Sequence, residues 1–330
     1  MAASAVISTA EPDPLGPVVL VGQARSGSSL ATLLVNRAGG FAINDAYAAQ
    51  AAEALGLPAA GRPAEAARLG RFREAMLARL EARSVPEAEG PIHRSARLTP
   101  RMGAAAAEAS AYAAARPGAD WASVWGAMLH AAAAAGGAPV WGWNTPPDYT
   151  RAAEILGAFP RARFVFVHRG LWAVLRSYKG LPAHWGRERA RFHPALQARA
   201  WAAAARAEAR LAAALPGRVH RLDHADLVAR PAETLAALAG FLGLPAPALD
   251  LSAIAPNASE RAALTRAEIW AARLGAGAEG RRAAGPPPEA PPGLGLGDLA
   301  RASLRAAGYY GAEALRSPDM RGRIARMLRA

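Results

Sequence analysis

Two glycines mark the first place in the chain where residue types and spacing could support chemistry. A short apolar segment ends at Gly22, and Gly27 follows with the G-x-x-x-x-G spacing of a phosphate-binding loop. Such a loop turns its backbone N–H groups toward an anion at the positive end of the next helix. Ser28 and Ser29 can add hydroxyl donors, and Arg25 adds a cation within the loop. The segment predicts a strand, a phosphate-binding loop and a helix.

This loop differs from that of ATPases and GTPases at one position. Ser28 stands where those enzymes carry the lysine that reaches the β- and γ-phosphates of the nucleotide. Its absence argues against hydrolysis of ATP or GTP. Arg25 supplies positive charge from a different point of the loop, where it can lie near the bridging oxygen of a bound group.

A second candidate site follows the apolar strand predicted for residues 163–167. In an open α/β sheet, ligands bind beyond the carboxyl ends of the strands, which is where Arg169 stands. A guanidinium fork suits a terminal phosphate, and Ser177, eight residues further on in the next predicted helix, can supply another donor. No aspartate follows the strand, so the sequence offers no magnesium ligand of the kind found in P-loop hydrolases.

Alternating strands and helices must position these two sites. Strands are predicted at residues 18–21, 163–167 and 218–222, with a strand or turn at 139–143. Helices between them imply a helix-rich α/β fold, with a parallel sheet flanked by helices. The expected organisation is a flexible leader at 1–16, a main domain at 17–274, a Gly/Pro-rich loop at 275–298 and a C-terminal helical segment at 299–330.

Both motifs resemble those of the sulfotransferase family. Residues 23–30 look like its 5′-phosphosulfate-binding loop, with Ala24 in place of the usual proline. The segment around Arg169 looks like its 3′-phosphate site, with Gly170 and Leu171 in place of the usual Asp-Pro. The resemblance implies a P-loop-like fold and 3′-phosphoadenosine 5′-phosphosulfate as the sulfuryl donor. It also implies a set of donor-binding residues: Arg25, Ser26, Gly27, Ser28, Ser29, Leu30, Arg169 and Ser177.

Weaker segments extend the resemblance over residues 18–245. In the segment that begins at Val140, Asn144 occupies the place of a lysine that is usual in the family, so it can donate a hydrogen bond but brings no charge. Residues 224–231 look like the family pattern Y-E-D-L-x-x-x-P, and residues 241–245 match F-L-G-L-P. The sequence predicts structural roles for these last two segments.

The general base of a sulfuryl transfer is harder to locate. Asp45 lies shortly after the first helix, where many relatives that act on carbohydrates or small molecules carry a carboxylate. Alternatively, Asn44 or Asp45 opens the helix predicted for residues 46–55 as its N-cap. Other branches of the family use a histidine, and His93 is the candidate for that role.

Composition restricts the partners. The formal net charge is +13, but nearly all of it comes from arginines scattered among alanines, without the basic, aromatic or zinc-binding patterns of nucleic-acid-binding modules. With no cysteine and no metal-binding histidine spacing, we expect no metal site. The N-terminus lacks the features of a signal peptide, and no run of about 18 strongly apolar residues occurs, so we expect a cytoplasmic protein without stable membrane insertion.

Three functions remain open from the sequence. The first is transfer of a sulfuryl group to a hydroxyl or amine of a small-molecule or glycan acceptor. The second is phosphoryl transfer by a P-loop kinase, although the loop lysine and the strand-end aspartate are missing. The third is a non-catalytic relative that keeps the nucleotide site, which Asn144 and the undecided base leave open.

Overall fold

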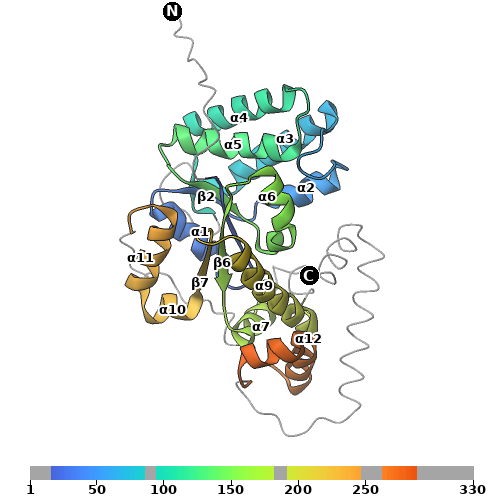
Figure 1. The fold of residues 1–330 in the computed structure, drawn as a ribbon, viewed down its shortest axis with the longest axis vertical. Coiled ribbons are helices and arrows are strands. Elements are labelled where there is room, and N and C mark those ends of the chain that lie inside the picture. The colour runs from blue at the N-terminus through green and yellow to red at the C-terminus, as the bar shows by residue number, and fades with distance from the viewer. Residues whose placement is uncertain (1–15, 86–93, 182–191, 247–261, 288–330) are drawn as a thin grey trace, which may run out of the picture.

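A parallel β-sheet forms the centre of the molecule (Figure 1). The computed structural model describes residues 16–85, 94–181, 192–246 and 262–287. Five strands lie in the order β2-β5-β1-β6-β7, and every neighbouring pair is parallel. Their bounds are β1 Val18–Gly22, β2 Phe41–Ile43, β5 Trp141–Asn144, β6 Arg163–His168 and β7 Val219–Asp223. The predicted α/β class is confirmed, and the strand that carries the phosphate loop is the central one.

Helices cover both faces of this sheet, because successive side chains of a strand point to opposite sides. In β1, Val18 and Leu20 join the core beneath α1 and α11, whereas Val19 and Val21 join the core beneath α3, α5, α6 and α9. In Figure 1, α3, α4 and α5 form the upper helical layer, and α7, α9 and α12 lie together at the bottom. The helices are α1 Ser28–Arg37, α2 Ala48–Ala54, α3 Ala66–Ala82, α4 Pro100–Ala115, α5 Trp121–Ala135, α6 Ala152–Ala158, α7 Leu171–Lys179, α9 Pro194–Ala214, α10 His224–Ala229, α11 Pro231–Leu242 and α12 Arg266–Ala284.

Local sequence explains where several helices begin. Thr99 caps α4 by accepting a hydrogen bond from the Met102 N–H, and Pro100 occupies the first turn, where no N–H donor is needed. Asp120 and Ser123 form a reciprocal capping box at the start of α5. Smaller elements are the 3₁₀ helix η2 (Pro146–Arg151) and the two-stranded parallel pair β3 (Ser84–Val85) and β4 (Ala96–Arg97).

The structure departs from the sequence prediction at strand β2 and in helix α12. Edge strand β2 has only three residues, too few for a periodic pattern, and the sequence did not predict it. Helix α12 continues to Ala284, so residues 275–284 are helical where a Gly/Pro-rich loop was expected. At Gly275 the backbone comes so close to α9 that an added Cβ would lie 1.9 Å from the Ala195 oxygen, which explains a glycine within a packed helix. Gly277, whose φ of 70° and ψ of −176° are not helical, then kinks α12.

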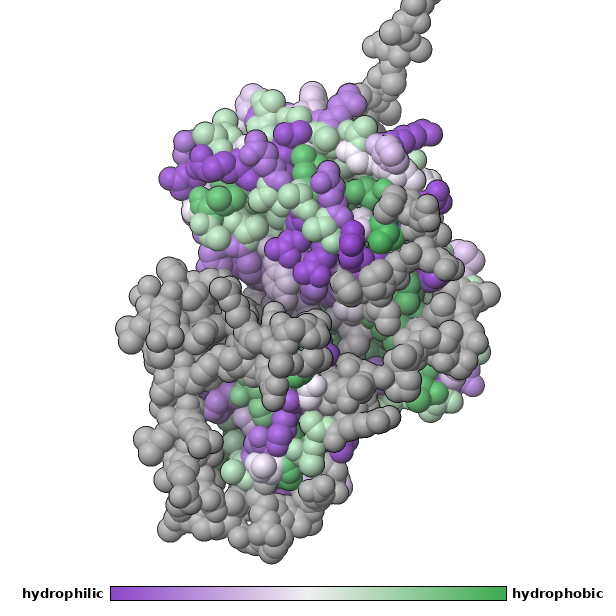
Figure 2. Space-filling view, turned by 180° about the vertical axis from the view of Figure 1, so that it is seen from behind, coloured by the Kyte–Doolittle hydropathy of each residue, from purple (hydrophilic) through white to green (hydrophobic). Residues whose placement is uncertain are grey.

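The surface drawn in Figure 2 mixes hydrophilic and hydrophobic residues over the upper helical layer. Large exposed hydrophobic side chains in the described part of the chain are scattered singly, as Tyr112, Val228 and Leu274. None of the described helices is long and apolar enough to cross a bilayer.

Close packing between β5 and β1 yields a stability prediction. A Cβ at Gly142 would lie 1.9 Å from the Val18 carbonyl oxygen of the neighbouring strand, so Gly142→Ala must force the two strands apart. We expect it to lower the free energy of unfolding by about 1–3 kcal/mol, the usual cost of overpacking. Urea denaturation measures this change.

The matched control is Gly103→Ala in α4. An added Cβ at Gly103 meets no atom within 4 Å, so this variant should gain about 0.5–1 kcal/mol from helix propensity. Equal denaturation midpoints for Gly142→Ala and the wild type would contradict the packing argument.

Candidate functional site

The loop between β1 and α1 is a tight turn that requires unusual backbone angles. Gly22 has a φ of 140°, and a Cβ there would lie 2.4 Å from the Val167 oxygen of β6. The Ser26 N–H donates to the Gln23 oxygen at 3.1 Å, while Arg25 and Gly27 are left-handed with φ of 72° and 99°. Glycine is therefore required at Gly22 for close approach and is favoured at Gly27 for conformation.

This loop ends at the positive end of α1. Gly27 is the N-cap residue and offers no side-chain cap, so the first-turn N–H groups of the helix remain available to an anion. Ser26 is buried, and its hydroxyl has no hydrogen-bond partner, which is costly unless a ligand satisfies it. Ser28 is buried beside it, whereas Leu30 packs against the core beneath α1. These features fit a bound phosphate or sulfate group.

The two predicted sites meet at this loop. Arg25 Nε donates to Ser177 Oγ at 3.3 Å, and Arg169 Nη1 donates to the Arg25 carbonyl oxygen at 3.2 Å. Ser177 is fully buried in α7, and only 6% of Arg169 is exposed. Arg25 is therefore in direct contact with Ser177, which lies 152 positions further along the sequence, and with Arg169, which lies 144 positions further along.

Positive charge gathers where these residues meet. Burial, together with the charges of Arg25 and Arg176, lowers the pKa of Arg169 from its usual value, although arginine stays protonated at neutral pH. Like charges this close disfavour one another, and an anionic ligand would relieve that repulsion. The electrostatics of the site thus favour a ligand with more than one negative group.

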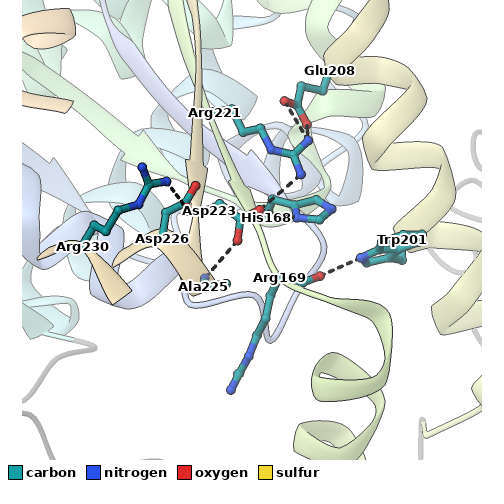
Figure 3. A network of polar contacts seen from close by, with 9 residues as sticks. All are labelled: His168, Arg169, Trp201, Glu208, Arg221, Asp223, Ala225, Asp226 and Arg230. Carbon is teal, nitrogen blue, oxygen red and sulfur yellow. Dashed lines mark hydrogen bonds and ion pairs between the residues drawn. The ribbon is translucent and has the colours of Figure 1, made fainter. Parts of the chain in front are cut away.

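A polar network behind Arg169 fixes the ends of β6 and β7 (Figure 3). His168 Nδ1 and Asp223 Oδ2 are 3.1 Å apart, and Arg221 Nη2 lies 3.2 Å from the same carboxylate oxygen. The other oxygen, Oδ1, accepts from the Ala225 N–H at 2.9 Å and so caps α10. Burial and the charge of Arg221 lower the pKa of His168, while Asp223 opposes them.

The side chain of Arg169 extends away from this network, toward the phosphate loop (Figure 3). Its carbonyl oxygen accepts from Trp201 Nε1 at 2.8 Å, which holds the backbone of Arg169 against α9. The network and Trp201 therefore anchor the main chain on one side and leave the guanidinium on the ligand side.

His224 is a residue of this site for which the sequence predicted only a structural role. Its Cδ2 atom lies 3.1 Å from the position of a Cβ built on Gly27. Burial and the nearby charge of Arg169 lower its pKa, which Asp223 partly offsets. The sequence did contain an indication that His224 belongs to the site. This residue directly follows β7 at the carboxyl edge of the sheet, where ligands are expected.

Strand β5, which pairs with β1, and the edge strand β2 beyond it bring two amides to the loop. Asn44 follows β2 and donates through Nδ2 to Ser29 Oγ at 2.8 Å. Asn144, the last residue of β5, donates through Nδ2 to Asn44 Oδ1. Both amides are buried. Asn144, which stands in place of a family lysine, thus reaches the loop through a second amide.

Asp45 follows Asn44 in a left-handed conformation, with φ of 50°. Its Oδ2 lies 3.2 Å from Arg83 Nη1, and its carbonyl oxygen accepts from Arg79 at 3.2 Å. Helix α2 begins after Tyr47, which is its N-cap and makes no side-chain cap, so the prediction that Asn44 or Asp45 caps this helix was wrong. The alternative base, His93, lies outside the described residues.

A buried carboxyl group links η2 to strand β5 and helix α2. Asp148 in η2 accepts hydrogen bonds from Trp143 Nε1 at 3.0 Å and from Gln50 Nε2 of α2 at 3.3 Å. Burial raises its pKa from 3.8 to about 6, against the effect of these hydrogen bonds and of the charge of Arg151. The folded state thus holds this proton more tightly than the unfolded chain does.

This shift predicts a pH-dependent stability. The contribution of Asp148 is fully present below the unfolded pKa of 3.8 and is lost as the pH rises through about 6. Asp148→Asn removes the titration, and the introduced amide can donate to Gln50 Oε1, which is buried and has no partner. At pH 8 we expect the free energy of unfolding of the variant to exceed that of the wild type by about 1–3 kcal/mol.

The stability gained by Asp148→Asn should become smaller as the pH falls toward 5. Urea denaturation at several pH values measures this difference in the free energy of unfolding. Asp226→Asn is the matched control, because that carboxylate is exposed on α10. Parallel stability curves for Asp148→Asn and the wild type between pH 5 and 8 would contradict the assignment.

Comparison with known proteins supplies the family. A profile of the Sulfotransferase family matches residues 17–248. Similar solved structures include the sulfotransferase domain from the curacin biosynthetic pathway (15% identity, 71% of this chain and 75% of that one, TM-score 0.44) and the sulfotransferase domain from the Synechococcus PCC 7002 olefin synthase (16%, 90% and 96%, TM-score 0.45). None of the curated proteins searched gives a significant match. Among the described residues, no three His, Asp or Glu side chains cluster as metal ligands would. The profile covers well over half of the chain, which therefore belongs to the sulfotransferase family.

Proposed function

We propose that this protein transfers a sulfuryl group from 3′-phosphoadenosine 5′-phosphosulfate to a hydroxyl or amine of an acceptor. The observation that carries the proposal is the contact between the phosphate loop and the second site, where Arg25 meets Ser177 and Arg169. A nucleotide with separate 5′ and 3′ phosphate groups needs both anion sites at one edge of the sheet. The partnerless hydroxyl of Ser26 and the crowding of arginines support an anionic ligand there.

Each residue then has a defined task. The bound donor supplies the sulfuryl group. The first-turn N–H groups of α1, with Ser26, Ser28 and Ser29, hold its 5′ end, and Arg25 stabilises negative charge on the leaving phosphate oxygen. Arg169 and Ser177 hold the 3′-phosphate. The acceptor oxygen or nitrogen forms its bond to sulfur as the bond to the phosphate oxygen breaks, and Asp45 takes the acceptor proton.

The position of Asp45 supports this task. It follows Asn44 directly, and Asn44 is hydrogen-bonded to Ser29 of the loop. The backbone of Asp45 therefore lies close to the end of the loop that we assign to the phosphosulfate. About a third of its side chain is exposed, so an acceptor can approach it.

Calorimetry with the wild-type protein tests the proposal. Adenosine 3′,5′-bisphosphate should bind without magnesium and at least about tenfold more tightly than ATP, because only the bisphosphate engages both anion sites. Tighter binding of magnesium-ATP would favour the kinase alternative. Release of the bisphosphate from the donor in the presence of a hydroxyl or amine acceptor would exclude a non-catalytic relative.

A further inference from the structure

Two buried asparagines and a partly buried serine form a hydrogen-bonded relay from the sheet to the phosphate loop. Strands β2 and β5 pair in parallel with Ile43 opposite Trp143, so the next residues along each strand, Asn44 and Asn144, lie side by side. Asn144 donates to Asn44, and Asn44 donates to Ser29 Oγ at 2.8 Å. At most 1% of either asparagine is exposed.

The relay has a direction. Asn44 Oδ1 accepts from Asn144 Nδ2, so the group that Asn44 presents to Ser29 is its NH₂, which can only donate. The oxygen of Ser29 is the acceptor in that bond, and its own proton must therefore point toward a different acceptor. Ser29 lies in the first turn of α1, among the N–H groups that are available to an anion.

We propose that Asn44 is a positioning residue that holds Ser29 as a hydrogen-bond donor to the 5′-phosphosulfate, an inference that rests on the proposed function. Asn144 fixes which end of the Asn44 amide faces the serine. The uncharged residue at the position of the family lysine thus acts on the site through Asn44 and Ser29. A serine that is held as a donor strengthens the binding of an anion, because hydrogen bonds to charged groups are stronger than those between neutral groups.

The test compares two nucleotides that differ only at the 5′ end. Adenosine 3′,5′-bisphosphate would engage Ser29, whereas adenosine 3′-phosphate would not. Asn44→Asp keeps the size of the side chain and the acceptor for Asn144, but it presents an oxygen to Ser29 and turns the serine proton away from the ligand. By calorimetry, the bisphosphate should bind about 10- to 100-fold more weakly, while affinity for adenosine 3′-phosphate should change little.

A second background separates this effect from the added charge. In a Ser29→Ala protein there is no hydroxyl to reorient, so Asn44→Asp should cause a much smaller further loss. A loss of equal size in both backgrounds would show that charge repulsion alone is responsible and would overturn the relay. Asn144→Ala, which releases the Asn44 amide without adding charge, should give a smaller loss that is again confined to the bisphosphate.

Other outcomes also decide the matter. Unchanged bisphosphate affinity in both Asn44→Asp and Asn144→Ala, with wild-type melting temperatures, would overturn the inference but not the proposed function. An equal loss of affinity for both nucleotides would show that Asn44 supports the fold rather than Ser29. That result would also overturn the inference. A wild-type protein that binds neither nucleotide would remove the proposed function and the relay with it.

Discussion

Arg169→Ala should abolish the preference of the protein for nucleotides that carry a 3′-phosphate. The guanidinium of Arg169 is almost fully buried, and we assign it to that phosphate. Truncating one partner of a buried charged pair costs about 2–5 kcal/mol, which is roughly 30- to several-thousand-fold in affinity. Calorimetry should therefore find adenosine 3′,5′-bisphosphate and adenosine 5′-phosphate bound almost equally by the variant, whereas the wild type prefers the bisphosphate.

Two further variants make this result specific. Arg230→Ala removes an exposed arginine on the same edge of the molecule, where it pairs with Asp226, and it should leave nucleotide preference intact (Figure 3). Arg169→Lys keeps the charge but not the planar fork, so it should recover only part of the preference. A variant without Arg169 that still discriminates in favour of the 3′-phosphate would contradict the assignment.

Local patterns in the sequence were enough to predict the phosphate loop. The predicted helix follows the loop directly as α1, because glycine spacing and apolar periodicity are patterns within about a dozen residues. The strands at 163–167 and 218–222 were also correct to within a residue or two at each end, since their apolar or alternating patterns are clear. What the loop binds stays a proposal, because no ligand contact follows from these local patterns.

Contacts between distant residues could not be predicted in the same way. That Asn44 meets both Asn144 and Ser29 depends on the strand order β2-β5-β1, and β2 is too short to leave a periodic signal. The proximity of His224 to Gly27 likewise depends on how β7 joins the edge of the sheet beside β6. The absence of an aspartate or asparagine cap on α2 arises because the chain turns through two left-handed residues, Asp45 and Tyr47, before the helix begins.

Asp45→Asn should reduce turnover by about 10²- to 10⁴-fold while nucleotide affinity and folding stay near wild type, if Asp45 is the general base. The substitution suits the backbone, because asparagine tolerates the left-handed conformation of residue 45. The lost ion pair with Arg83 is partly exposed and should contribute no more than about 1 kcal/mol to stability. Turnover is measured as release of adenosine 3′,5′-bisphosphate from the donor, with the best acceptor in a panel of hydroxyl and amine compounds.

Arg83→Ala tests whether the Asp45 carboxylate takes the acceptor proton or only holds Arg83 in place. It removes the guanidinium 3.2 Å from Asp45 but leaves the carboxylate in place, while Arg79 still holds the carbonyl oxygen of the same residue. If Asp45 takes the acceptor proton, Arg83→Ala should keep most of the turnover that Asp45→Asn loses. If the carboxylate serves only to hold Arg83, the two variants should lose turnover to the same extent. Equal losses would therefore move the role of general base to another residue, and His93→Ala would be the next variant to measure.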